Sequence, residues 1–129
     1  MEVGSNIRGY LTKKHITALT KKAHSYNQQD KKKGRLYYDP KYDRLNSPKL
    51  TVDDIIDLIQ KYGLECYYCN DICDIIPKSK YSNDQLTLDR LDNNISHKKS
   101  NCVICCYQCN TVRSNYFTSQ EFKKIKNRC

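Results

Sequence analysis

The sequence contains no tryptophan, and hydrophobic residues make up only 38% of its 129 residues, so any hydrophobic core must be small. It has no apolar run that approaches the length of a membrane span, which excludes a transmembrane protein. Its beginning, MEVGSNIRGYLTKKH, lacks the apolar segment of a secretory signal. We therefore expect an intracellular protein, in the cytoplasm or nucleus, that is not secreted and has no membrane partner. The absence of repeats and low-complexity tracts favours one domain over residues 1–129.

What the chain has instead is positive charge and tyrosine. Lysine and arginine number 23 against 14 acidic residues, which gives a formal charge of +9, and eleven tyrosines supply most of the aromatic surface. An excess of positive charge favours an anionic partner, and nucleic acid is the commonest large one. Solubility alone, or an AT-rich genome, would also produce a chain rich in lysine, asparagine, isoleucine and tyrosine.

The N-terminal half of the sequence predicts two helices. Residues 11–33 place apolar side chains on a loosely helical period, and Gly34 follows as a stop. A basic loop without a clear period leads to the clearest helix, residues 51–63, where Thr51 and Asp54 form a variant capping box. Its predicted buried face consists of Ile55, Ile56, Leu58 and Ile59.

The C-terminal half predicts a β-hairpin and two further helices. Residues 86–91 and 101–105 have strand-like patterns with a turn-rich segment between them. From Cys106 the sequence can turn helical, and Thr118 with Glu121 forms a capping box for a last helix. The side chains expected to pack inward from this last helix are Phe122 and Ile125.

Two Cys-x-x-Cys pairs are the most specific motif in the sequence: Cys66 with Cys69, and Cys106 with Cys109. Two intervening residues allow both thiolates of a pair to reach one tetrahedral ion, and two pairs complete a closed shell. A closed shell leaves no position for chemistry, so we predict a structural zinc, which also suits a small core. Cys105 competes with Cys106 as a ligand, but Cys106 has the matching spacing to Cys109.

Three further cysteines lie outside these pairs, namely Cys73, Cys102 and Cys129. We do not expect disulfides, because the compartment should be reducing. Cys73 and Cys102 suit small buried hydrophobic positions, and Cys129 suits a free terminal thiol. A second zinc held by Cys73, Cys102, Cys105 and His97 is an alternative that the sequence leaves open.

Around the two cysteine pairs, the sequence resembles the HNH nucleases, also called ββα-metal or His-Me finger nucleases. The segments that carry the resemblance are CYYC, LTLDRLDN and SNCVICCYQCNTVRSN, within about residues 50–127. An Asp-Arg pair and a tyrosine inside the first cysteine pair make it most similar to the PacI-type restriction endonucleases. The resemblance implies an α+β fold in which a ββα-metal core with a four-cysteine zinc knuckle follows N-terminal helices. Residues 1–49 would form a basic N-terminal helix and loop, and residues 50–127 the zinc-stapled core.

The resemblance also implies a catalytic metal. Asp89 corresponds to the family's metal-binding carboxylate, and Asn110 corresponds to the second ligand, at the start of the helix. A carboxylate and an amide oxygen are hard ligands, which suit Mg²⁺ or Mn²⁺. Asn101 corresponds to the asparagine that braces the catalytic loop, and Arg113 to a basic residue placed for a phosphate.

The general base is where the sequence departs from the family's pattern. The usual histidine directly after the metal-binding aspartate is here Arg90. Arginine does not lose its proton in proteins, so Arg90 can hold a phosphate but cannot act as a base. The resemblance makes Tyr68 the first candidate for the base. His97 in the hairpin loop is the second, because imidazole is the usual base near neutral pH.

Together these residues predict a metal-dependent HNH endonuclease that hydrolyses phosphodiester bonds of DNA, which we expect to be double-stranded. Arg35 and the basic N-terminal segment would contact the DNA. The alternative is a zinc-ribbon module that binds nucleic acid without cutting it, whereas a structural zinc protein with a protein partner explains the charge poorly. PacI-type enzymes have a further zinc knuckle where this chain has no cysteine before Cys66, so the target sequence cannot be inferred. The sequence also leaves open whether the chain acts as a monomer or a homodimer.

Overall fold

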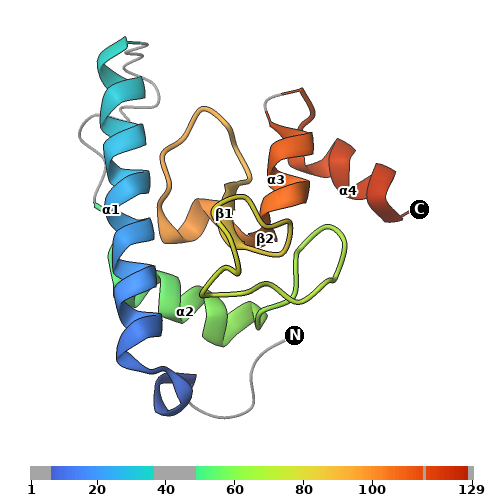
Figure 1. Cartoon of the computed structure of the whole chain (residues 1–129). Helices are drawn as coiled ribbons and strands as arrows, with labels where there is room; N and C mark the ends of the chain where they lie inside the picture. The colour runs from blue at the N-terminus through green and yellow to red at the C-terminus, as the bar shows by residue number, and fades with distance from the viewer. Residues whose placement is uncertain (1–6, 37–48, 115, 128–129) are drawn as a thin grey trace.

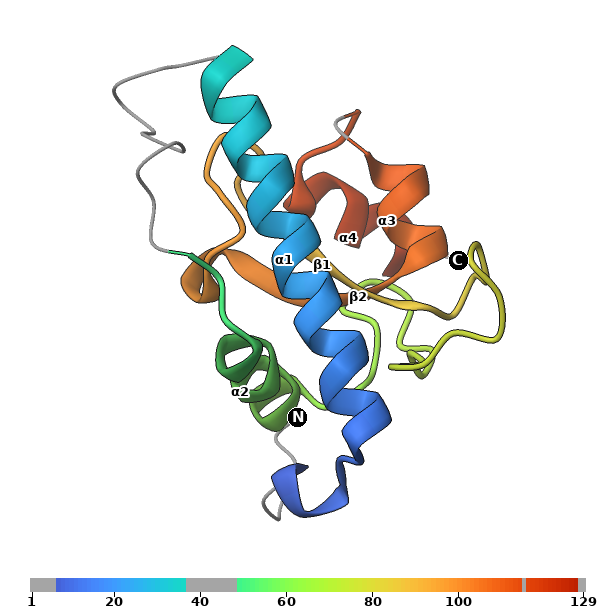
Figure 2. The same ribbon diagram turned by 60° about the vertical axis from the view of Figure 1, so that its left-hand side comes forward.

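The computed structural model describes residues 7–36, 49–114 and 116–127, which form a mixed α+β fold. A two-stranded antiparallel sheet lies at the centre, with the long helix α1 on one side and helices α3 and α4 on the other (Figure 1). Figure 2 shows α1 crossing in front of the sheet. In chain order the described elements are η1 (Ile7–Tyr10), α1 (Lys13–Leu36), α2 (Val52–Tyr62), β1 (Leu86–Arg90), η3 (Lys99–Asn101), β2 (Cys102–Cys106), α3 (Tyr107–Arg113) and α4 (Ser119–Asn127).

Helix α1 packs one apolar face onto the rest of the fold. Leu19 and Ala23 are buried, and Tyr26 packs against the core, as the helical spacing predicted. The helix ends at Leu36 rather than at the predicted stop, so Gly34 lies inside it. A glycine inside a helix costs about 1 kcal/mol relative to alanine, which is too little to end a long helix.

Helix α2 begins and ends as the sequence predicted. The Thr51 hydroxyl accepts from the Asp54 backbone N–H (3.1 Å), and the Asp54 carboxylate accepts from the Thr51 N–H (3.0 Å), which completes the capping box. Gly63 ends the helix at φ 76°, in the left-handed region that favours glycine. The four predicted apolar residues are all buried, namely Ile55, Ile56, Leu58 and Ile59.

Strands β1 and β2 form the predicted hairpin, with boundaries that differ from the prediction by one residue. They pair antiparallel, with Leu86 opposite Cys106 and Arg90 opposite Cys102. Side chains alternate between the faces of a strand, so Thr87 and Asp89 project to the same face. Helix α3 follows β2 directly, which agrees with the expected order of elements, but two strands and a helix occur in many folds and do not identify a family.

Helix α4 carries the second predicted capping box. The Thr118 backbone N–H donates to the Glu121 carboxylate (2.9 Å), and the Glu121 N–H donates to the Thr118 hydroxyl (3.1 Å). Phe122 is buried as predicted, but the prediction that Ile125 packs inward is wrong, because its exposed fraction is 43%. Phe122, one turn earlier, already fills the position against the Tyr68 ring.

The described elements share one hydrophobic core. It joins Leu19 of α1, the buried face of α2, Leu86 and Leu88 of β1, the β2 cysteines and Phe122 of α4. Tyr68 is its largest aromatic side chain, which agrees with the absence of tryptophan. None of the helices in the described residues is long and apolar enough to cross a membrane.

Candidate functional site

Four cysteines from the two pairs converge on one point. The Sγ atoms of Cys66, Cys69, Cys106 and Cys109 all lie within 4.8 Å of one another, and none is in a disulfide. Sulfur atoms around a tetrahedral zinc, at about 2.3 Å from the ion, are about 3.8 Å apart. The Cys69 and Cys106 sulfurs are 3.8 Å apart, so the set fits such an ion. The prediction of these four ligands is confirmed to this extent: they form a cluster that could hold a metal ion such as zinc.

Local backbone structure holds each pair in position. The Cys66 carbonyl accepts from the Asn70 N–H (3.0 Å), which closes a tight turn, and the Cys66 sulfur accepts from the Tyr68 N–H (3.4 Å). Cys106 caps the N-terminus of α3, and its sulfur accepts from the Cys109 N–H (3.4 Å). The first turn of α3 therefore places Cys109 beside Cys106, as the spacing requires.

The cysteines outside the pairs behave as buried thiols. Cys105 points its sulfur at the Cys106 carbonyl (3.3 Å), and burial raises the pKa of both Cys73 and Cys102 to about 12. Cys129 lies outside the described residues. The alternative of a second zinc finds no support among the described residues, because they contain no second group of three or more metal-binding side chains within reach of one ion.

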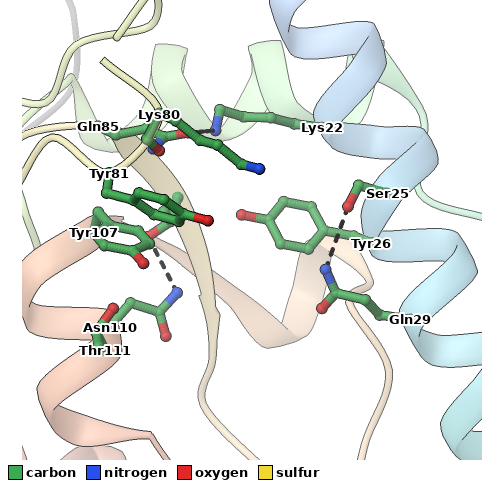
Figure 3. Close-up of a pocket in the computed structure, with 11 residues that line it drawn as sticks. Lys22, Ser25, Tyr26, Gln29, Lys80, Tyr81, Gln85, Tyr107, Asn110 and Thr111 are labelled. Atoms are coloured by element: carbon green, nitrogen blue, oxygen red, sulfur yellow. Dashed lines mark hydrogen bonds between the residues drawn. The ribbon is translucent and has the colours of Figure 1, made fainter. Parts of the chain in front are cut away.

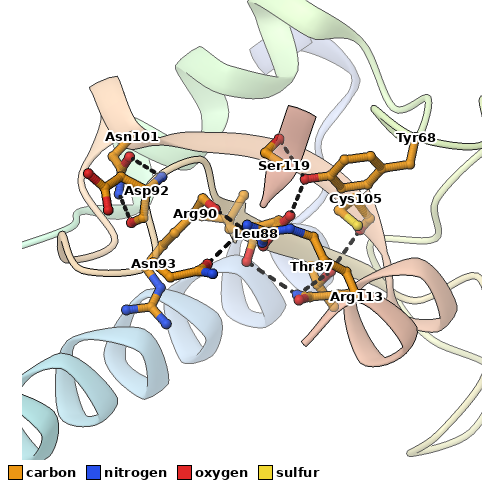
Figure 4. A network of polar contacts seen from close by, with 12 residues as sticks. Tyr68, Thr87, Leu88, Arg90, Asp92, Asn93, Asn101, Cys105, Arg113 and Ser119 are labelled. Atoms are coloured by element: carbon orange, nitrogen blue, oxygen red, sulfur yellow. Dashed lines mark hydrogen bonds and ion pairs between the residues drawn. The ribbon is translucent and has the colours of Figure 1, made fainter. Parts of the chain in front are cut away.

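A buried polar network includes Tyr68, Arg113 and Ser119 (Figure 4). At its centre lies Asp89. Its side chain accepts hydrogen bonds from Arg113 Nη1 on one oxygen and from the Tyr68 hydroxyl on the other. The Tyr68 hydroxyl also lies 2.9 Å from Ser119 Oγ, which ties α4 to the network. Burial raises the pKa of Asp89 above its usual value, although the Tyr68 hydrogen bond and the Arg113 charge oppose this shift. The charge of Arg113 beside it favours the carboxylate form.

Arg113 lies inside the protein rather than on a phosphate-binding surface. Its side chain is 1% exposed, and its guanidinium also donates to the Arg90 carbonyl (3.2 Å) and to Asn93 Oδ1 (3.0 Å). The predicted phosphate contact does not fit this burial. The reason is the hairpin geometry: Asp89 projects toward α3, where the last turn offers Arg113 as its counter-charge.

Asn101 holds the segment that connects the two strands. Its side-chain nitrogen donates to the carbonyls of Asp92 (3.0 Å), Ile95 (3.3 Å) and Ser96 (3.1 Å), and its oxygen accepts from the Asp92 N–H (3.0 Å). One amide thus holds the backbone of this segment at Asp92, Ile95 and Ser96, and a bracing position is what the resemblance implies for this residue. Asn101 itself is buried.

Tyr68 is bonded to Asp89 and does not face open space. It is 1% exposed, and burial together with the hydrogen bond to Asp89 raises its pKa well above its usual range. A phenol in this position donates its proton to the carboxylate and holds it in place. This geometry does not favour Tyr68 as the base.

A polar pocket of about 240 Å³ opens beside this network, between β1, the strand connection, α1 and α3. It brings together four of the predicted residues, Asp89, Arg90, His97 and Asn110. Asn110 donates its amide nitrogen to Thr87 Oγ1 (3.1 Å) and to the Leu88 carbonyl (3.4 Å), which leaves the amide oxygen as its acceptor. Tyr68, Asn101 and Arg113 support the pocket from behind without lining it.

A histidine–carboxylate pair that the sequence did not reveal lies at this pocket. Both carboxylate oxygens of Asp30 of α1 contact His97: Oδ1 and Oδ2 lie 3.0 Å and 3.2 Å from His97 Nδ1, and Oδ2 also accepts from the His97 backbone N–H (2.8 Å). Tyr26 stacks on the imidazole with ring centroids 4.4 Å apart. Burial raises the pKa of Asp30, but the hydrogen bonds and charge of His97 outweigh burial and lower this pKa below its usual value. Asp30 is the only acidic residue in α1, and this isolated charge was the one feature of the sequence that could have indicated the pair.

No family model, curated protein or solved structure matches this chain. The resemblance therefore depends on the sequence motifs alone, and the function has to be argued from the site. The side chain of Arg35, predicted to contact DNA, lies outside the described residues, as does most of the loop that follows α1.

Proposed function

We propose that this chain is a metal-dependent HNH endonuclease that hydrolyses DNA phosphodiester bonds. The observation that supports this most is the 240 Å³ pocket, at which separate segments bring Asp89, His97 and Asn110 together. A carboxylate, an imidazole and an amide oxygen around one polar pocket are the groups that metal-assisted hydrolysis requires. The charge of +9 suits a phosphodiester substrate.

Asp89 and Asn110 would hold Mg²⁺ or Mn²⁺. The fit is good for Asn110, because its amide nitrogen is already bonded and its oxygen is the remaining group. Each carboxylate oxygen of Asp89 accepts one hydrogen bond and keeps a second lone pair. When bound, the ion would supply a Lewis acid for the phosphoryl oxygens.

His97 is the base that the geometry favours. Its Nδ1 faces the Asp30 carboxylate, so the proton of the neutral ring belongs on Nδ1 and the basic lone pair on Nε2. His97 would take a proton from the attacking water, and Asp30 would stabilise the imidazolium that forms. Tyr68 was the first candidate from the resemblance, but its hydroxyl donates to Asp89 and it does not line the pocket.

Arg90 would hold the phosphate. It lines the pocket next to Asp89, and one of its nitrogens donates to the Ile95 carbonyl at 3.4 Å. A guanidinium carries five N–H donors in a planar fork, so it can keep such a contact and still bind two phosphate oxygens. The developing negative charge of the transition state would be offset at the same place.

A second candidate is a zinc-ribbon module that binds nucleic acid without cutting it. One observation favours it: both oxygens of Asp89 are already bonded, to Arg113 and to Tyr68, so the carboxylate has a structural task without any metal. This candidate explains the cysteine cluster and the charge, but it gives no role to the His97–Asp30 pair at the pocket.

Plasmid cleavage with Mg²⁺ or Mn²⁺ tests the proposal, with DNA binding measured in parallel. We expect wild-type protein to nick or cut, and His97→Gln to reduce single-turnover cleavage by about 10²- to 10⁴-fold while binding DNA normally. Tyr68→Phe keeps the ring in the core and is the matched comparison. If wild type binds DNA but leaves it intact with every divalent metal, the binding module is correct. A dead Tyr68→Phe beside an active His97→Gln would return the base to Tyr68.

A further inference from the structure

A second and larger pocket adjoins the one described above (Figure 3). Its volume is about 410 Å³, within the range of about 300 to 1,000 Å³ typical of small-ligand sites. The two pockets share Tyr26, Gln29 and Asn110, so a molecule that extends from one enters the other. The second pocket lies between α1, α3 and the loop that precedes β1.

The lining of this pocket combines cations with aromatic rings. Lys22 of α1 and Lys80 of the loop are its charged residues, and none of the described residues that line it is a carboxylate. Lys22 is partly buried and donates to Gln85 Oε1 (3.0 Å), so its charge is held at the wall rather than free in solvent. Burial lowers its pKa, because the partly buried ammonium loses hydration. These features favour an anionic ligand.

The aromatic part comes from Tyr81 and Tyr107, whose ring centroids are 6.2 Å apart. Tyr81 is 66% exposed, and the Lys80 ammonium lies 5.4 Å from its ring centroid. Figure 3 shows Tyr26 pointing from α1 across the pocket toward Tyr81. A planar base can stack on such an exposed ring. Amides and hydroxyls at the rim supply hydrogen bonds, from Gln29 and Thr111.

The geometry points to a binding site for one unstacked DNA base, stacked on the exposed ring of Tyr81 and flanked by Tyr107, whose ring is tilted by 45° to that of Tyr81, with the neighbouring phosphates against Lys22 and Lys80. The site rests on the proposed function, because the shared wall places this base next to the phosphate held by the 240 Å³ pocket. Such a base comes from a single strand or from a duplex whose base has been flipped out, and both present the same aromatic face.

The test uses a 12-nucleotide DNA with a central 2-aminopurine, as a single strand and as a duplex, in buffer freed of divalent metals so that no cleavage occurs. Stacking of a base on an aromatic side chain contributes about 1–3 kcal/mol, so Tyr81→Ala should weaken single-strand binding by roughly 5- to 150-fold. It should also remove the quenching of 2-aminopurine emission. Tyr10→Ala is the matched control, since Tyr10 is equally exposed at 68% and does not line the pocket.

Tyr107→Phe should keep the affinity and the quenching, and Tyr107→Ala should lose both, because the ring and not the hydroxyl is required. Quenching of 2-aminopurine in the duplex that depends on Tyr81 identifies base flipping. Quenching confined to the single strand identifies single-stranded DNA as the source of the base. If Tyr81→Ala behaves like Tyr10→Ala in both arms, the base site is wrong. Plasmid cleavage tests the proposed function separately. A Tyr81-dependent signal without cleavage would contradict only the nuclease, and cleavage without that signal would contradict only the base site.

Discussion

Replacing Arg113 with methionine should destabilise the protein strongly, although the sequence predicted that this residue contacts a phosphate of DNA. The side chains of Arg113 and Asp89 are only 1% and 5% exposed and form an ion pair. Methionine fills much of the same volume but leaves the Asp89 charge buried with only the Tyr68 hydroxyl to stabilise it. The change also removes the donors to the Arg90 carbonyl and to Asn93.

Breaking a buried ion pair by removing one partner costs about 3–5 kcal/mol. The entropy of unfolding is about 2.1 cal/mol/K per residue, which for 129 residues gives about 0.27 kcal/mol/K. The melting temperature should therefore fall by about 11–18 °C. An exposed pair provides the contrast: Lys99 and Asp57 lie 3.1 Å apart with side chains 51% and 52% exposed. Lys99→Met should cost at most about 1 kcal/mol, a shift below about 4 °C.

Thermal melts followed by circular dichroism, at a fixed excess of zinc, measure both shifts. Adding Asp89→Asn to Arg113→Met should recover part of the loss, because the double variant no longer buries an unpaired charge. The reasoning fails if Arg113→Met melts within about 4 °C of wild type, or if Asp89→Asn makes it less stable still.

Three further predictions concern metal, acid and salt. Elemental analysis should find one zinc per chain, lost in Cys106→Ser with the fold of the C-terminal half, but kept in Cys105→Ser, whose sulfur faces a carbonyl. The pKa of Asp30 is lower in the folded chain than in the unfolded chain, so on acidification the unfolded chain binds the proton at a higher pH. The stabilisation that ionised Asp30 contributes is therefore present above about pH 4 and is lost as the pH falls through the pKa of the folded state. Urea unfolding from pH 7 to pH 3 should thus show the gap between wild type and Asp30→Asn closing below pH 4, and a constant gap would contradict this. DNA affinity should fall steeply with salt in a fluorescence titration, because a chain of charge +9 releases counterions on binding, and a flat response would argue against DNA.

The sequence predicted what local chemistry determines. The Thr51 and Thr118 capping boxes form as expected, because each depends on residues only three positions apart. The cysteine cluster was predictable for the same reason, since two intervening residues fix each pair. The predictions were wrong where the packing of the chain determines the end of a helix or the burial of a side chain. Gly34 lies within α1, and Ile125 is exposed although its helical period suggested a buried position.

The contacts that give the candidate site its character could not be predicted from the sequence. Asp30 and His97 are 67 positions apart, and Asp89 and Arg113 are 24 apart. Their pairing depends on how α1 and α3 pack against the hairpin, which no periodic pattern encodes. Motif matching could name Arg113, but only the packed structure shows its guanidinium turned inward to a carboxylate.

Tyr68 belongs to two centres at once. Its backbone N–H donates to the Cys66 sulfur at 3.4 Å, while its hydroxyl donates to Asp89. A zinc ion at the cysteines and a ligand at Asp89 would therefore both act on Tyr68, and any such linkage is reciprocal: a ligand that repositions Asp89 would change the zinc affinity by the factor by which zinc changes the affinity for that ligand.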